Sequence, residues 1–197
     1  KQEGIERRLG IEADDFVGGE EMLRLWLEEK PWDFVIGSVH FNQGWGFDNP
    51  DTIDRYNDLD LLALYKDHFH TVEKLIQSGL FDFVAHLDNL KVFNFRPNED
   101  ELISMYEKIG DLLMQHNMAT ELSTGLKYRY PIQECCPSPT FLEVLVKKGV
   151  PFTLSSDAHF AVDLGMLIPE AVQQLKDLGV TEIATFKNRK RIMLPIE

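Results

Sequence analysis

The sequence predicts an α/β fold whose strands form a parallel sheet, either open or closed into a barrel. Short apolar runs rich in β-branched and aromatic residues alternate with amphipathic stretches of helical period, an order typical of parallel sheets. Several runs end in a histidine or a carboxylate, which places ionisable groups at one rim of the sheet, where α/β proteins bind ligands. The clearest run is 34–41, which contains His40 and leads into a loop with Gly44, Gly46 and Pro50.

The expected elements follow from the same patterns. Apolar runs predict strands over 9–12, 34–41, 81–87, 118–122, 151–156 and 182–186, and an edge strand over 191–196. Helical periodicity predicts helices over 20–29, 59–78, 98–117, 140–148 and 169–178. Gly79 ends the second helix, Asn98 can cap the third, and Pro139 opens the fourth. Without a repeat or an interdomain linker, residues 1–197 are expected to form one domain.

Composition narrows the class of protein. A chain of 197 residues with 44% hydrophobic and 27% charged residues is ordinary for a globular protein with a buried core. The formal net charge of −13 disfavours nucleic-acid binding, which needs clustered Lys and Arg. No apolar stretch approaches the length of a membrane span, and no signal-peptide core is present, so we expect a cytoplasmic enzyme. The adjacent cysteines, Cys135 and Cys136, predict neither a disulfide framework nor a thiolate zinc site.

Metal-binding residue types stand where the apolar runs end. Each has an ordinary alternative when taken singly: His40 could be a core histidine bonded to a backbone carbonyl, and Glu12 a surface carboxylate. Jointly, imidazoles and carboxylates at one rim suit zinc, manganese or iron. The histidines on predicted helices, His68, His70 and His116, are not expected to be ligands. The candidate ligands are Glu12, His40, His86, Asp157 and His159.

Such a site favours phosphoryl chemistry. Two or more metals can clamp a phosphoryl group and generate a hydroxide nucleophile near neutral pH. No nucleophile elbow, P-loop or dinucleotide-binding motif appears in the sequence. Phosphate also needs cationic contacts, and Lys127 and Arg129 follow a strand on the expected metal side, as Lys91 does after His86. The alternative for these cations is a solvated surface position.

These residues resemble the PHP (polymerase and histidinol phosphatase) superfamily, specifically its histidinol-phosphatase branch. The resemblance covers nearly the whole chain, and the run from Ser38 into the Trp-Gly-Phe-Asp segment is its most branch-specific part. The loop after residue 122, Ser-Thr-Gly-Leu-Lys, resembles the phosphate-side loop of the branch. The other matching motifs are Gly10-Ile11-Glu12-Ala13-Asp14, Gly37-Ser38-Val39-His40-Phe41, Ala85-His86-Leu87-Asp88 and Ser156-Asp157-Ala158-His159.

The resemblance implies a distorted seven-stranded β/α barrel with a trinuclear metal cluster at its C-terminal rim. Glu12 would bridge two divalent metals, His40 and His86 would hold one of them, Asp157 the other and His159 the third. Asp157 and His159 are thereby the expected catalytic residues. The residues expected to contact substrate are Lys127, Arg129 and Lys91 for phosphate, Phe47 and Trp45 for the pocket wall, and Asp48 for an amine.

One departure from the family pattern is large. The His-x-His motif that opens the family's first strand is absent, so the sequence is expected to represent the C-terminal portion of the domain, with an incomplete barrel and about half of the cluster's ligands. We expect a phosphomonoesterase that hydrolyses L-histidinol phosphate in histidine biosynthesis. The alternatives are a PHP phosphoesterase acting on a nucleotide or nucleic-acid end, and a non-catalytic domain that retains the fold. Metal identity and oligomeric state stay open.

Overall fold

A five-stranded sheet forms the centre of the computed structural model, which describes residues 4, 6–14 and 18–196. Its order is β1 (Gly10–Asp14), β2 (Phe34–Ser38), β5 (Phe83–Val84), β6 (Ala119–Ser123) and β7 (Phe152–Ser155), and every neighbouring pair is parallel. Within the described ranges β1 and β7 are the two edges, so the barrel is not closed. The predicted α/β class with a parallel, incomplete barrel is confirmed.

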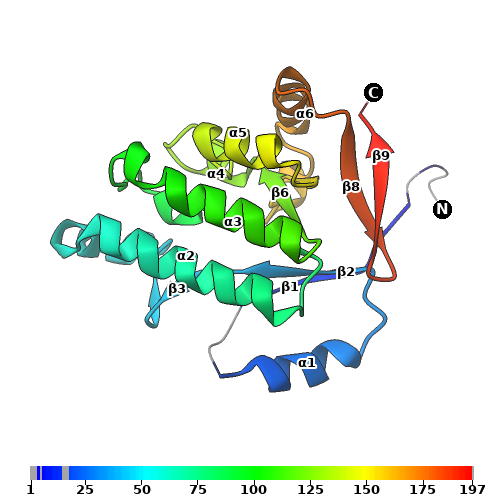
Figure 1. Cartoon of the computed structure of the whole chain (residues 1–197), viewed down its shortest axis with the longest axis horizontal. Helices are drawn as coiled ribbons and strands as arrows, with labels where there is room; N and C mark the ends of the chain where they lie inside the picture. The colour runs from blue at the N-terminus through cyan, green and yellow to red at the C-terminus, as the bar shows by residue number, and fades with distance from the viewer. Residues whose placement is uncertain (1–3, 5, 15–17, 197) are drawn as a thin grey trace.

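Helices cover this sheet on more than one side. The α-helices are α1 (Glu20–Glu28), α2 (Leu61–Ser78), α3 (Ile103–Gln115), α4 (Gly125–Arg129), α5 (Pro139–Lys148) and α6 (Ile168–Asp177). The helices α2, α3 and α5 lie side by side and pack on the sheet, whereas α1 lies on the opposite side of β1 and β2 (Figure 1). None of the described helices has the length and apolar character that crossing a bilayer requires.

Two antiparallel hairpins complete the strands. The first joins β3 (Phe41–Asn42) to β4 (Trp45–Gly46), and the second joins β8 (Glu182–Lys187) to β9 (Lys190–Pro195) beside β7. Short 3-10 helices occupy Pro50–Asp58, Asn89–Lys91, Glu99–Glu101 and Ala161–Asp163.

The strand predicted over 34–41 is wrong at its end, because β2 stops at Ser38 and the chain turns into the β3–β4 hairpin. The backbone N–H of His40 donates to the carboxylate of Asp14 at 3.2 Å, instead of to a neighbouring strand. The strand predicted over 81–87 is likewise reduced to β5, since the N–H of His86 donates to the side chain of Glu121 at 3.0 Å. Side-chain acceptors thus end both strands just where the candidate ligands begin.

Helix ends differ less from the prediction. Asp60 caps α2 by accepting from the N–H of Ala63 at 3.1 Å, and Gly79 ends it with a left-handed φ of 67°. The helix predicted over 98–117 is broken, because Asn98 caps the short 3-10 turn at Glu99–Glu101 and α3 begins only at Ile103.

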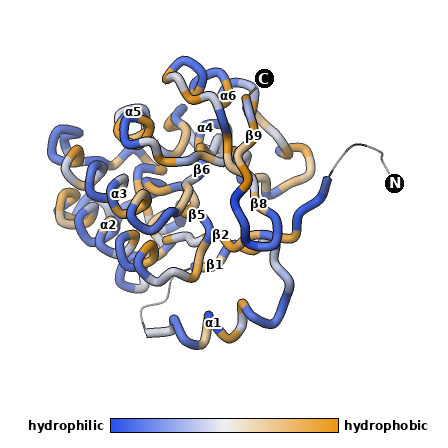
Figure 2. Tube along the Cα trace, turned by 45° about the vertical axis from the view of Figure 1, so that its right-hand side comes forward, coloured by the Kyte–Doolittle hydropathy of each residue, from blue (hydrophilic) through white to orange (hydrophobic). Residues whose placement is uncertain are grey.

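The core fills the space between the sheet and α2, α3 and α5. The helices alternate hydrophilic and hydrophobic residues along the chain (Figure 2), and their apolar faces supply the buried side chains. A Cβ at Gly37 of β2 would lie 2.7 Å from the side chains of Leu75 and Phe81, so any larger residue there would force these buried side chains to shift. Fully buried members include Leu75, Ile76, Ile109, Leu113, Phe141 and Leu145.

One core histidine should make stability depend on pH. His68 on α2 is buried and donates from Nε2 to the carbonyl of Leu87 at 2.9 Å. Burial lowers the pKa of His68 to about 4, below its ordinary value of 6.5, despite that hydrogen bond. Below pH 6.5 the unfolded chain therefore takes up a proton that the folded chain does not. The contribution of neutral His68 to the free energy of unfolding is complete above pH 6.5, decreases as the pH falls and is lost at about pH 4. The free energy of unfolding changes by about 3 kcal/mol over this range.

We predict that His68→Gln, which keeps an amide donor for Leu87 but does not titrate, removes this part of the pH dependence. Urea unfolding of both proteins at pH 7, 5.5 and 4 measures it. Because other groups titrate in both chains, the difference between the two free energies of unfolding is the relevant quantity, and it should shift by about 3 kcal/mol in favour of the variant between pH 7 and 4. Parallel pH profiles would contradict the prediction.

Candidate active site

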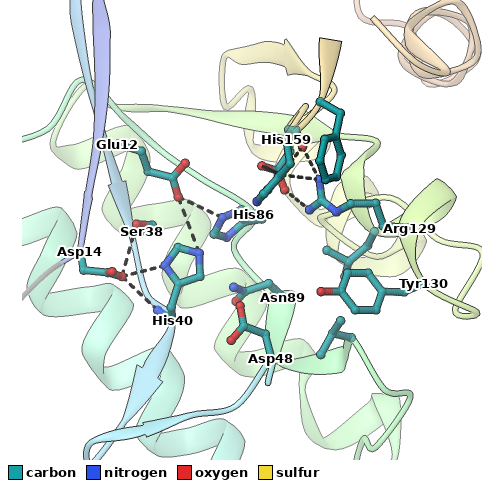
Figure 3. Close-up of a pocket in the computed structure, with 14 residues that line it drawn as sticks. Glu12, Asp14, Ser38, His40, Asp48, His86, Asn89, Arg129, Tyr130 and His159 are labelled. Atoms are coloured by element: carbon teal, nitrogen blue, oxygen red, sulfur yellow. Dashed lines mark hydrogen bonds and ion pairs between the residues drawn. The ribbon is translucent and has the colours of Figure 1, made fainter. Parts of the chain in front are cut away.

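The carboxyl ends of the parallel strands bring the predicted ionisable groups to one rim. Glu12 lies on β1, His40 follows β2 by two residues, His86 follows β5 by two, and Asp157 follows β7 by two. All four line one cavity of about 470 Å³, together with His159. Figure 3 shows the side chains of the labelled residues pointing into this pocket from different strands and loops.

The closest cluster joins one carboxylate to two imidazoles. Oε1 of Glu12 lies 3.2 Å from Nε2 of His86 and 3.7 Å from Nε2 of His40. The ligand atoms of the three residues all lie within 4.8 Å of one another. The two imidazole rings pack edge to face, with their centroids 4.9 Å apart. One carboxylate and two imidazoles are a donor set suited to zinc, manganese or iron. These residues therefore fit a divalent cation.

Glu12 and His86 shift each other's pKa in opposite directions. Partial burial would raise the pKa of Glu12, but the hydrogen bond and charge of His86 hold it at about 2. Burial would lower the pKa of His86, which is 5% exposed, but the hydrogen bond that its ring donates to Glu12 and the charge of Glu121 raise it to about 9. Glu12 is therefore ionised at neutral pH, while a metal at this position would have to displace a proton from His86.

Sequence reasoning gave Asp14 no role, yet it orients His40. Its Oδ1 lies 2.8 Å from Nδ1 of His40 and also accepts from the N–H of His40 and from the hydroxyl of Ser38, at 3.2 and 3.4 Å. A carboxylate on Nδ1 fixes the ring so that Nε2 faces Glu12. The signal was present, because residues two apart on a strand share a face and Asp14 follows Glu12 by two.

Glu121 is a second residue without an expected role. It is 3% exposed in the middle of β6, and its Oε1 accepts from the N–H of His86. Burial raises the pKa of Glu121 to about 7, although the charge of His86 opposes this. A carboxylate inside a predicted buried strand is rare enough to have been noticed in the sequence.

His159 and Arg129 lie on the side of the pocket away from Glu12 (Figure 3), and they form a second cluster with Asp157. The guanidinium of Arg129 pairs with the carboxylate of Asp157 and donates to its backbone carbonyl. Nδ1 of the exposed His159 lies 3.2 Å from the same guanidinium. The ligand atoms of Asp157 and His159 are not part of the close set formed by Glu12, His40 and His86. The rim therefore holds two clusters facing one cavity.

The three predicted phosphate contacts have different surroundings. Arg129 lines the pocket, but Nζ of Lys127 pairs with Glu170 of α6 at 2.9 Å, outside it. The reason is that 125–129 forms the helix α4 rather than the expected loop, and residues two apart on a helix point about 200° apart. Lys91 is enclosed in the protein and paired with Asp88, so its ammonium does not reach the pocket.

The expected aromatic wall is also placed differently. Phe47 is fully buried and packs edge to face on His68, with the ring centroids 5.5 Å apart. Trp45 packs on Tyr56 with the centroids 4.8 Å apart, and its Nε1 donates to Thr52. The β3–β4 hairpin turns both rings into the core, where their large apolar surfaces are removed from water. Neither lines the pocket.

Other side chains form the pocket wall in their place. Asp48 lines the cavity, half-buried, and forms no ion pair with a described residue. The apolar part of the wall comes from side chains that sequence reasoning had not singled out, namely Val92, Leu126, Tyr130 and Phe160.

The PHP domain model matches residues 1–125 of the chain. A curated protein from Deinococcus radiodurans, named "Probable histidinol-phosphatase", is 36% identical over 186 residues, which are 94% of this chain and 70% of the relative. Among solved structures, the fold is similar to that of a histidinol phosphate phosphatase from Lactococcus lactis in complex with zinc, L-histidinol and phosphate. That match has a TM-score of 0.75 at 18% identity and covers 97% of this chain and 73% of the other.

We predict that Asp14→Ala weakens metal binding without unfolding the chain. Loss of the carboxylate frees the ring of His40 to rotate, and loss of such an outer-shell partner typically costs ten- to a hundredfold in metal affinity. Zinc titration by calorimetry measures the change, and thermal unfolding monitors the fold. Asp54→Ala, at an exposed aspartate remote from the pocket, is the control and should bind zinc as the parent does. Equal zinc affinity in all three proteins would show that Asp14 does not support metal binding.

Proposed function

Because the chain belongs to the PHP-domain family, we propose that it is a metal-dependent phosphomonoesterase that hydrolyses L-histidinol phosphate to L-histidinol and phosphate, in histidine biosynthesis. One observation carries the proposal: a donor set for divalent cations and a guanidinium face each other across one cavity. The name of the Deinococcus relative, and the ligands in the Lactococcus structure, motivate the choice of substrate.

Glu12, His40 and His86 would hold the cation, with zinc as the first choice. We propose Asp157 and His159 as further ligands and as catalytic residues, because both face the same cavity. When bound, divalent cations polarise phosphoryl oxygens and lower the pKa of water. Glu12 contributes a fixed negative charge, and Asp14 keeps Nε2 of His40 directed at the metal position.

Arg129 would bind the phosphate. It is the only Lys or Arg among the described residues that line the pocket, and its planar fork matches two phosphate oxygens. The guanidinium is held in place by Asp157, so it is positioned at the cavity before substrate enters. Bound phosphate would contact the guanidinium beside Asp157 or take the place of that carboxylate.

Asp48 would recognise the rest of the substrate. Histidinol phosphate carries a cationic amine, and a half-buried carboxylate with no ion-pair partner among the described residues is suited to bind it.

We place the reaction in the cytoplasm, because Cys135 and Cys136 are free thiols, as is usual in a reducing compartment.

The phosphate role predicts that Arg129→Ala lowers kcat/KM about ten- to a hundredfold for every phosphomonoester, since a charge-assisted hydrogen bond contributes roughly 1.5–3 kcal/mol. Lys127→Ala is a matched control on the same helix, because its ammonium pairs with Glu170 outside the pocket. It should change kcat/KM less than twofold. Steady-state phosphate release measures both variants, and a larger loss in Lys127→Ala than in Arg129→Ala would reverse the assignment.

The substrate assignment predicts that zinc-loaded protein hydrolyses L-histidinol phosphate in preference to p-nitrophenyl phosphate and a nucleoside monophosphate. Asp48→Asn should lower kcat/KM for L-histidinol phosphate about ten- to a hundredfold, because it removes a charged partner of the amine. The same variant should leave p-nitrophenyl phosphate nearly unaffected, since that ester has no amine.

Other outcomes discriminate between the alternatives. Preference for the nucleotide would indicate a PHP phosphoesterase with another substrate. Zinc binding without hydrolysis of any ester would indicate a non-catalytic domain. Equal losses of kcat/KM for L-histidinol phosphate and p-nitrophenyl phosphate in Asp48→Asn would show that Asp48 does not bind the amine.

A further inference from the structure

We propose that the buried ion pair between Asp88 and Lys91 is a positioning device, which fixes the metal-side residue His86 relative to the phosphate-side residue Arg129. The inference rests on the proposed function only for the roles of those two residues. The pair itself belongs to neither cluster of the pocket, and its two members lie outside the cavity lining.

The pair connects two segments that are distant in sequence. Both side chains are 2% exposed, and Nζ of Lys91 lies 3.0 Å from Oδ2 of Asp88. The same Nζ donates to the carbonyl of Cys135 at 2.6 Å, and Oδ2 of Asp88 accepts from the N–H of Ser138 at 2.9 Å. The ion pair therefore bonds the loop 86–91 to the segment 135–138 at two points.

On the metal side, the loop 86–91 begins with His86 and is held throughout. His68 donates to the carbonyl of Leu87, and Tyr56 donates to that of Leu90 at 3.1 Å. Nδ2 of Asn89 donates to the carbonyl of Val39 at 3.2 Å, the residue before the other imidazole of the cluster. The loop is thus bonded both to the core and to the segment that carries His40.

On the phosphate side, the segment 135–138 is bonded to the strand that leads to Arg129. Cys136 exchanges two backbone hydrogen bonds with Ser123, of 2.7 and 2.9 Å, at the end of β6. The helix α4 begins two residues later at Gly125 and carries Arg129 at its end. One connection from the metal side to the phosphate side therefore runs through Asp88 and Lys91, in addition to the hydrogen bond from His86 to Glu121 on the same strand β6.

Stability alone is a poor reason for such a pair. Removing two charges from water costs free energy that their attraction often fails to recover, and well-packed apolar residues commonly stabilise a core as much. Geometry is what the charged pair adds, since the ion pair and its two charge-assisted hydrogen bonds to the backbone fix both distance and direction. A phosphoryl group held between a metal centre and a guanidinium requires that distance to be constant.

The test uses the whole chain and the double variant Asp88→Asn/Lys91→Met. The variant leaves no uncompensated buried charge and keeps an acceptor for the N–H of Ser138, but it removes the link to Cys135. Calorimetry measures the affinity for Zn²⁺ alone, and then the affinity of the zinc-loaded chain for inorganic phosphate. We expect zinc affinity to fall about ten- to a hundredfold, as for lost outer-shell partners, and phosphate affinity to fall with it.

Two further variants keep the test decisive. Asp88→Glu retains the charge and lengthens the link by one methylene, so zinc affinity should fall severalfold even if the double variant does not fold. Asp111→Asn/Lys148→Met removes an ion pair between α3 and α5, remote from the pocket, and should leave both affinities unchanged. Wild-type affinities for zinc and phosphate in a folded Asp88 variant would overturn the proposal. Because binding is measured directly, failure of the chain to hydrolyse histidinol phosphate would count against the proposed function alone.

Discussion

The contact between Glu12 and His86 is the interaction on which the site depends. It joins β1 to the loop after β5 across the intervening strand β2, and the segment after β2 supplies His40 beside it. A carboxylate and two imidazoles this close would be costly without their mutual charge compensation, because each is partly or largely removed from water. The surrounding acceptors, Asp14 and Glu121, bind the backbone N–H groups of the two histidines and end the strands there.

The fold and the metal-side cluster were predictable because they depend on patterns of period two and on strand direction. Parallel strands place their carboxyl ends together whatever the loops do, so Glu12, His40 and His86 could be grouped from sequence alone. Asp14 escaped prediction because its role is to orient another side chain, and such roles depend on distances that the sequence does not contain. Asp157 reaches the same pocket through a backbone φ of 46°, which no sequence pattern indicated.

The substrate side was harder to predict because it depends on local conformation. Whether residues 125–129 form a loop or a helix decides which of Lys127 and Arg129 faces the cavity, and the sequence alone allowed both. Trp45 and Phe47 were expected in the pocket wall, but burial of their large rings places both in the core. Lys91 was expected to contact phosphate because it follows His86, and its pairing with the buried Asp88 depends on the tertiary fold.

The edge position of β1 gives the site a further property. Within the described residues β1 pairs only with β2, in a register that sets Glu12 opposite Ile36. A slip of one residue would turn Glu12 to the other face of the sheet and bring Ile11 or Ala13 to the histidines. A cation shared by Glu12 and His86 can bind only the correct alignment, so its binding free energy also selects against the misaligned one. A bound metal would then stabilise the correct strand register in addition to its role in the reaction.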